Sequence, residues 1–197
     1  MKKIFSLSLV LLLILTSTAL AAKSTVKIAR LPIIIQHNKL DYETSVALET
    51  KFARAVNIPL NGTLQLAEYI PPKKSSDAMN KIWQQMHSQN KNAKISDAVK
   101  ILAKDLKADI VVVPILHRYS QYVTPSDLNF ESTLSSAVAA ELIIYDRRTD
   151  TLTDKRFSRR FNDNYNRFGT ASYLAGECFD KLIKDTELRK IIHNIRK

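Results

Sequence analysis

The chain has 197 residues, 45% of them hydrophobic, and a formal net charge of +11. This length and apolar content suit one domain with a real core. With only 3 glycines and 1 cysteine, a glycine-rich phosphate-binding loop and an internal disulfide are both excluded. The positive charge favours anionic partners, although it also serves solubility.

The N-terminal residues have the pattern of a secretory signal peptide. Two lysines precede an apolar run at residues 4–15, and small residues follow, ending in Ala21 and Ala22. The run is shorter than the roughly 20 residues of a membrane span, so cleavage is expected after one of these alanines. We therefore predict a signal peptide at residues 1–22 and a single α/β domain at residues 23–197. It would be exported to the periplasm or cell envelope and would not span the membrane after cleavage.

The first elements are predicted to be a strand, a helix and a second strand. Residues 26–35 are rich in β-branched side chains and predict a buried strand. Pro32 has no N–H for a ladder, so this strand lies at an edge or is interrupted there. Asp41 is a suitable N-cap for a helix that ends near Val56. Residues 63–70 alternate and predict a half-buried strand.

Two helices are predicted next, joined by a polar linker at residues 88–94. The first is expected to begin at Ser75 or Ser76 and the second at Ser96, because serine is a preferred N-cap. On the first helix a core-facing stripe is formed by Met79, Ile82, Trp83 and Met86. On the second, the inward residues are expected to be Ala98, Ile101, Leu102 and Leu106.

Residues 110–116 carry no polar side chain. A strand that is apolar at every position is covered on both faces, so helices are expected on both sides of the sheet. Pro114 predicts a bulge or a break within it. Beyond this run the pattern alternates and the strand should project past the core. One side is expected to carry His117, Tyr119 and Gln121, and the other Arg118, Ser120 and Tyr122.

The remaining chain predicts a hairpin and two helices. Residues 124–136 are expected to form a polar loop, either a flexible insertion or a functional loop. Strands at residues 137–147 and 152–161 follow, with Phe157 and Phe161 on one face and Arg156 and Arg160 on the other. Thr170 caps a helix whose apolar stripe comprises Ala171, Leu174, Ala175, Cys178 and Leu182, and a short helix at residues 188–195 ends the chain.

The order of elements is therefore β-α-β-α-α-β-β-β-α-α. Helical crossovers imply parallel neighbours among the first three strands, and hairpin links imply antiparallel pairing among the last three. The predicted fold is α/β, with a mixed five-stranded sheet and helices on both faces.

Catalytic chemistry finds little support in the residues. Cys178 lies on the apolar stripe of its helix without a nearby activating group. The histidines are scattered without the spacing of a metal site, and they are His37, His87, His117 and His193. We expect no catalytic residue, no metal and no cofactor, and hence no enzyme. His117 either lines a recognition surface or is a solvated histidine at the end of a strand.

Four motifs carry a family resemblance. They are ARLPIII at residues 29–35, LKAD at 106–109, RYSQY at 118–122 and LIIYDRRTDTL at 142–152. Together they resemble the periplasmic α/β domain shared by the TolB amino-terminal domain, LpoB and CsgG-like envelope proteins. Those families carry glycine where this chain has Lys107 and Pro114, and a Thr-Gly turn at Asp150 and Thr151. The resemblance covers about residues 26–183. It implies a non-enzymatic envelope module that binds other proteins or assembles with itself.

The leading hypothesis is a binding module that holds a protein partner, or a second copy, through a sheet edge and a basic hairpin. The candidate binding residues are Arg118, Tyr119, Tyr122, Arg147, Arg148, Arg156 and Arg160. One alternative is a binder of anionic envelope polymer or of a membrane surface, and another is a hydrolase that depends on Cys178. Nucleic acid is not expected as a partner. High salt should weaken a polymer contact more than a packed protein interface.

Overall fold

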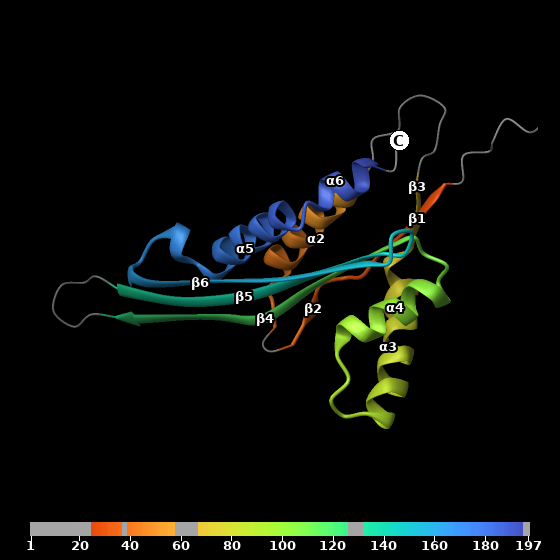
Figure 1. Cartoon of the computed structure of the whole chain (residues 1–197). Coiled ribbons are helices and arrows are strands. Elements are labelled where there is room, and N and C mark those ends of the chain that lie inside the picture. The colour runs from red at the N-terminus through yellow and green to blue at the C-terminus, as the bar shows by residue number, and fades with distance from the viewer. Residues whose placement is uncertain (1–24, 37–38, 58–66, 126–131, 195–197) are drawn as a thin grey trace, which may run out of the picture.

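A mixed β-sheet forms the centre of the computed structural model, which describes residues 25–36, 39–57, 67–125 and 132–194 (Figure 1). In sheet order the strands are β3 (Ala67–Ile70), β1 (Val26–Arg30), β4 (Ile110–Pro125), β5 (Ser132–Asp146) and β6 (Thr151–Asn164). A sixth strand, β2 (Ile34–Ile35), also pairs with β4. The pairs of β1 with β3 and β4 are parallel, and those of β5 with β4 and β6 are antiparallel. The predicted α/β fold with a mixed sheet is confirmed, with six strands where five were expected. The predicted signal peptide lies outside the described residues.

The additional strand exists because the predicted first strand is interrupted at Pro32. Arg30 of β1 is in register with Val112, and Ile34 of β2 is in register with Ile115. Between these two pairs, the β1–β2 segment with Pro32 therefore has one residue more than β4. A side chain from the neighbouring helix replaces the missing ladder bond, since the Ile33 N–H donates to a Glu49 carboxylate oxygen at 2.7 Å.

Pro114 does not break β4, so the predicted irregularity at this residue was wrong. It pairs in register with Leu142. The carbonyls of Val112 and Leu116 accept hydrogen bonds from the β1–β2 segment at 3.0 and 3.1 Å. Because backbone groups alternate in direction along a strand, Pro114 also faces that segment, at the point where it is interrupted. The ring occupies a position where no ladder donor is needed.

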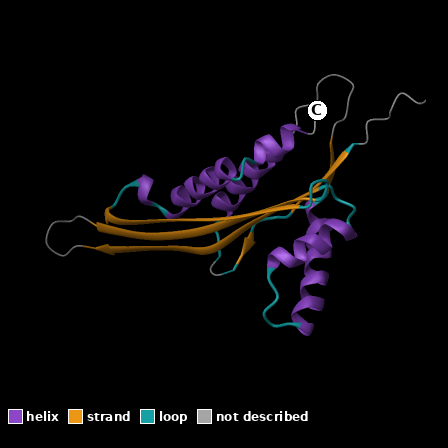
Figure 2. Cartoon of the chain, in the orientation of Figure 1, coloured by secondary structure: helices purple, strands orange, loops and turns teal. Residues whose placement is uncertain are grey.

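Helices cover both faces of the sheet, as predicted (Figure 2). One face is covered by α2 (Tyr42–Val56), α5 (Ala171–Asp185) and α6 (Leu188–His193), and the other by α3 (Pro72–Gln89) and α4 (Ile95–Asp105). In the first core Phe52 and Phe179 meet edge to face at 4.9 Å. In the second, Met79 and Ile82 are buried with Trp83 packed against them. The predicted stripe of α3 is thus confirmed.

Two predicted N-caps are correct and two are wrong. Asp41 accepts a hydrogen bond from the Thr44 N–H at 2.7 Å, and Thr170 caps α5 through the Tyr173 N–H. In contrast, α3 begins at Pro72, which places Ser75 inside the helix, buried. A proline at the first position loses no hydrogen bond and has the helical φ already set.

The start of α4 also differs from the prediction. The helix begins at Ile95 after Lys94, without a side-chain cap, so Ser96 lies within it. Ile101 is 45% exposed, while Val99 and Ala103 are fully buried. The buried face is therefore rotated by about one residue from the predicted stripe, although Ala98 and Leu102 face the core as expected.

Most of the predicted loop at residues 124–136 is strand. The pairing of β4 with β5 continues to Pro125 and Ser132, and only residues 126–131 between them lie outside the described part of the chain. Leu134 is fully buried. In the described part of this segment, an apolar residue on the covered face is flanked by polar residues, which is the alternation of a strand with one exposed face.

The corner between α4 and β4 has a left-handed residue. Lys107 has a φ of 51°. The N–H of Ala108 bonds back to the Ala103 carbonyl at 2.9 Å, which closes the helix in a Schellman motif. Asp109 then accepts from the Lys27 N–H at 2.9 Å, joining this corner to β1.

Candidate functional site

The distal half of the sheet is covered by helices on one face only. We call this region the β-arm and define it as residues 118–125 of β4, 132–141 of β5 and 154–164 of β6. Figure 1 shows α5 above it, whereas α3 and α4 lie beneath the other end of the sheet. We call the uncovered side of the β-arm the open face.

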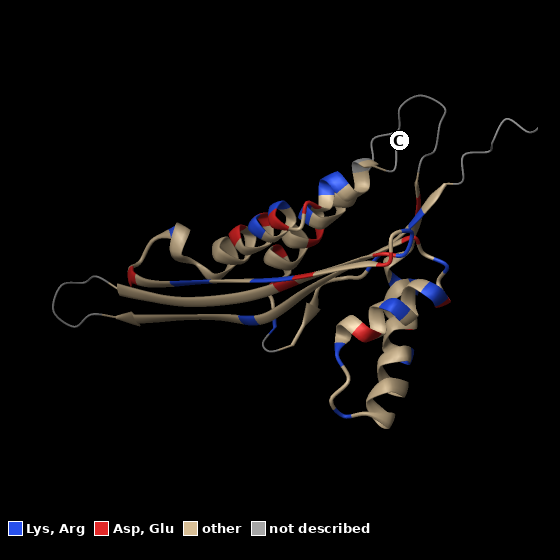
Figure 3. Cartoon of the chain, in the orientation of Figure 1, with Lys and Arg blue, Asp and Glu red and all other residues tan. Residues whose placement is uncertain are grey.

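Side chains on the open face form three rows across the strands. The rows are Arg118–Ala139–Ser158, Ser120–Ala137–Arg160 and Tyr122–Ser135–Asn162. The central strand contributes only small side chains, and the outer strands contribute the long ones. Figure 3 shows basic residues on both outer strands, β4 and β6. The result is a row of small residues on β5 between Arg118 on β4 and the basic residues Arg156 and Arg160 on β6.

The opposite face of the β-arm packs on the helices. Leu134 and Val138 are buried there, and Phe157 and Phe161 pack against the same core. The predicted division of β6 into an aromatic and a basic face is therefore correct. It places Arg156 and Arg160 on the open face.

A bulge at His117 marks the beginning of the β-arm. Leu116 pairs with Ala140 and Arg118 with Ala139, so His117 is an extra residue in β4. The insertion reverses the side-chain parity that simple alternation predicts. His117 and Arg118 lie toward the open face, while Tyr119 lies on the covered face, where its hydroxyl donates to Asp41 at 3.2 Å. The prediction that His117, Tyr119 and Gln121 share one side was wrong for His117.

A buried carboxylate holds this histidine in place. Glu141 is 2% exposed. It accepts a hydrogen bond from His117 Nε2 and pairs with Arg156 Nε at 2.9 Å. His117 Nδ1 lies 2.7 Å from the Gln36 amide oxygen. His117 is therefore a bound member of a polar cluster rather than a solvated histidine at a strand end.

Burial and hydrogen bonding shift the pKa values of the two carboxylates in this cluster, Glu141 and Asp154, in opposite directions. Burial alone would raise the pKa of Glu141, but hydrogen bonds from His117, Asp154 and Arg156 outweigh it and lower the pKa. The pKa of Asp154 is raised, by burial and then by the adjacent Glu141. Glu141 is consequently an anion that partly neutralises Arg156. Among the described residues, Arg118 and Arg160 make no ion pair.

The remaining predicted arginines lie at the other end of the sheet. Arg147 donates to the Ala108 carbonyl at 2.8 Å and to Asp109 at 2.6 Å. Arg148 donates to both oxygens of Asp146. The Arg147 bonds join the β5–β6 turn to the α4–β4 corner, whereas the Arg148 bonds stay within the turn. Of the predicted site, the structure brings together Arg118, Tyr122, Arg156 and Arg160, and it places Tyr119, Arg147 and Arg148 elsewhere.

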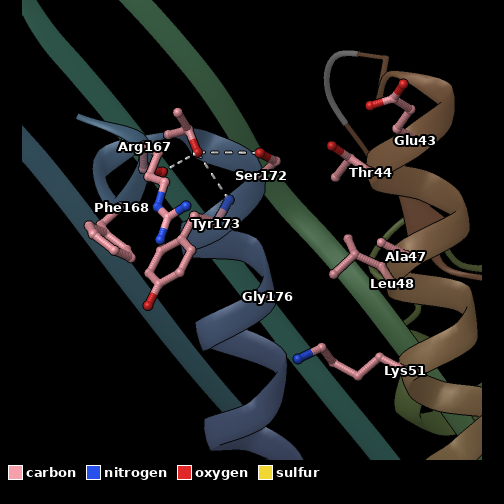
Figure 4. Close-up of a pocket in the computed structure, with 11 residues that line it drawn as sticks. Glu43, Thr44, Ala47, Leu48, Lys51, Arg167, Phe168, Ser172, Tyr173 and Gly176 are labelled. Carbon is pink, nitrogen blue, oxygen red and sulfur yellow. Dashed lines mark hydrogen bonds between the residues drawn. The ribbon is translucent and has the colours of Figure 1, made fainter. Parts of the chain in front are cut away.

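A second surface feature lies on the covered side of the sheet. A groove of about 550 Å³ separates α2 from the start of α5 (Figure 4). Phe168, in the short helix η1 (Arg167–Gly169), meets Tyr173 edge to face at 5.2 Å. Both rings are about half exposed. Neither ring was predicted to be part of a site, although Tyr173 falls off the apolar stripe of α5 and Phe168 precedes that helix.

The buried thiol has the environment of a core residue. Cys178 is fully buried, and burial raises its pKa to about 11. Near neutral pH it remains a protonated thiol, which is a poor nucleophile. Within the described ranges, no group of three or more His, Cys, Asp or Glu residues is arranged to hold a metal ion. No helix in those ranges is both long and apolar enough to cross a membrane.

Comparisons with known proteins show a distant similarity to solved structures of bacterial proteins. No family model and no curated protein matches the chain. Among solved structures, lipoprotein GNA1162 from Neisseria meningitidis is 14% identical, with a TM-score of 0.37, over 81% of this chain and 99% of its own. The hypothetical protein CT253 from Chlamydia trachomatis is 13% identical, with a TM-score of 0.41, over 87% and 98%. The LpoB C-terminal domain from Salmonella enterica is 10% identical, with a TM-score of 0.34, over 73% and 90%. At these values the similarity assigns neither a family nor a function to the chain.

Proposed function

We propose that this protein is an exported, non-enzymatic module of the bacterial envelope that binds an acidic protein partner on the β-arm, through the open face and the sheet edge beside it. Export rests on the predicted signal peptide. The absence of catalysis is inferred from the buried, protonated Cys178, the one candidate nucleophile that the sequence offered.

One observation carries the binding proposal. Arg118 and Arg160 are exposed, stand on opposite borders of the open face and make no ion pair with any described residue. Between them Ala137 and Ala139 leave the backbone of β5 accessible to close approach. Tyr122 is 70% exposed at the distal end. Unpaired arginines beside an exposed tyrosine combine the residue types that dominate protein interfaces.

A protein partner explains this composition better than an anionic polymer does. A charged polymer or membrane surface needs positive charge, but it does not need a row of small residues that exposes the backbone of β5. The buried Glu141 also lowers the net charge at the inner end of the face. The polymer hypothesis remains the alternative outcome of the test.

The test is crosslinking of the tagged full chain in its own envelope, followed by identification of the captured material. The double variant Arg118→Glu/Arg160→Glu should lose at least tenfold of the captured partner, which corresponds to about 1.4 kcal/mol. The control Lys91→Glu/Lys94→Glu makes the same charge change between α3 and α4 and should capture normally. Retention of the partner at high salt supports a packed protein interface, whereas complete release indicates a polymer contact.

A further inference from the structure

The outer strand of the β-arm is an unusually complete edge. β6 has 14 residues, and all of them pair with β5 in one continuous register. On its other side no strand is present among the described residues. All of its residues are exposed except Thr153, Phe157 and Phe161, which are partly exposed. The edge therefore offers a row of backbone groups that a further strand can bond.

The direction of these groups follows from the ladder. The N–H of Tyr165, one residue beyond β6, donates to the Ser132 carbonyl at 2.9 Å. Odd-numbered residues thus direct their backbone toward β5, and even-numbered residues direct theirs outward. Arg156, Ser158 and Arg160 present outward N–H and C=O groups at the centre of the edge.

Natural sheets block such edges by short strands, prolines, bulges or charges. β6 has no proline and no bulge, and it is long. Its only such feature is its charged side chains, of which Lys155, Arg156, Arg159 and Arg160 are basic and Asp154 and Asp163 are acidic, so the basic ones are in excess. The free edge of β4 beyond Leu116 is different, because it starts at the bulge and ends at Pro125.

The sign of this charge selects the occupant. A second copy pairing antiparallel about Ser158 would place Arg156 opposite Arg160, and like charges directly opposite each other destabilise a strand pair. An acidic strand has the opposite effect, because each carboxylate meets an arginine across the new pair. Self-assembly in this register is therefore disfavoured, whereas an acidic chain can place a carboxylate opposite each arginine.

We infer that β6 takes up an extended acidic segment of the partner as a seventh strand, with acidic residues four positions apart facing Arg156 and Arg160. This inference rests on the proposed function and specifies its binding mode. The new backbone hydrogen bonds contribute affinity whatever the sequence of the partner segment. The two arginines add the preference for acidic side chains.

The probe is a synthetic ten-residue peptide of alternating Thr and Val with two Glu four positions apart, and its control carries Gln at both positions. With the full-length protein, the Glu peptide should bind at least about tenfold more tightly than the Gln peptide. Hydrogen exchange should slow at the amides of Arg156, Ser158 and Arg160. Equal binding of the two peptides, or slowed exchange along β4 instead, would overturn the inference.

Ser158→Pro tests the backbone directly. It removes an outward N–H, leaves the bonds to β5 intact and should weaken the Glu peptide about tenfold. If this variant does not fold, Asn162→Pro makes the same change at another outward position. Arg160→Glu should weaken binding as well, and Lys91→Glu should not.

The two hypotheses fail in different ways. If Arg160→Glu loses the crosslinked partner while Ser158→Pro keeps both partner and peptide, the open face binds without strand addition and only the inference is wrong. If neither change affects the partner or the peptide, the proposed function is wrong as well.

Discussion

The two halves of β4 show how one strand serves two environments. At the base of the sheet, from Ile110 to Leu116, α2, α5 and α6 lie on one side and α3 and α4 on the other, and the residues are almost completely buried. In the β-arm the same strand is covered on one side, and Tyr122 is 70% exposed. The base is apolar on both faces and the arm on one. The bulge at His117 separates the two regimes.

The largest expected change in the free energy of unfolding is in the core at the base of the sheet, and the exposed β-arm provides the comparison. Phe179 is fully buried at the base and packs on Phe52. Phe179→Ala should lower the free energy of unfolding by about 3–5 kcal/mol, because it leaves a cavity. Tyr122→Ala in the β-arm should change it by less than about 0.5 kcal/mol. Urea unfolding monitored by circular dichroism measures both. A large loss from Tyr122→Ala would show that the open face is packed in the isolated protein.

The second-largest expected change in stability concerns the polar cluster of His117, Glu141 and Arg156, where the base meets the β-arm. Glu141→Gln should lower the free energy of unfolding by about 1–3 kcal/mol at neutral pH, because a buried charged hydrogen-bond acceptor is lost. The pKa of Glu141 is lowered in the fold. Its ionisation thus adds stability above the unfolded pKa of about 4.3, and this stability is lost as the pH falls toward the folded pKa. The difference between wild type and Glu141→Gln should therefore shrink below about pH 4.

Asp154 supplies a control of opposite sign. Its pKa is raised in the fold, so its ionised form is disfavoured there and lowers stability above the unfolded pKa. Asp154→Asn should accordingly raise the free energy of unfolding at neutral pH and have no effect in acid. A loss of stability from Asp154→Asn would show that its carboxylate supports the cluster.

Sequence patterns predicted the base more completely than the arm. The apolar run at residues 110–116 has one physical explanation, burial on both faces, and the structure confirms it. The bulge at His117 carries no local signal, and the partner of this histidine, Glu141, lies in another strand. The same holds for the site, where Arg118, Tyr122, Arg156 and Arg160 converge only through the register. Arg147 could not be assigned to a structural role without the position of Asp109.

The third effect compares two glycines on the covered side. A Cβ at Gly169 would lie 2.3 Å from the Phe161 ring, whereas one at Gly176 meets nothing within 4 Å. Gly169→Ala should cost about 1–3 kcal/mol by forcing that ring out of place. Gly176→Ala should gain about 0.5–1 kcal/mol, since alanine favours the interior of α5. Thermal unfolding of both variants tests whether η1 is anchored on the β-arm through this contact. Equal effects would contradict it.

The smallest effect is at the corner that begins β4. Lys107 has a left-handed φ of 51°, which costs a residue with a Cβ about 1–2 kcal/mol relative to glycine. Glycine loses more backbone entropy on folding, so the net gain from Lys107→Gly should be about 0.5–1 kcal/mol in urea unfolding. Lys107→Ala removes the charge but keeps the Cβ, and it should leave stability unchanged. A gain from alanine equal to that from glycine would assign the effect to charge. A gain from glycine alone would show that the left-handed backbone at this corner favours glycine over a residue with a Cβ.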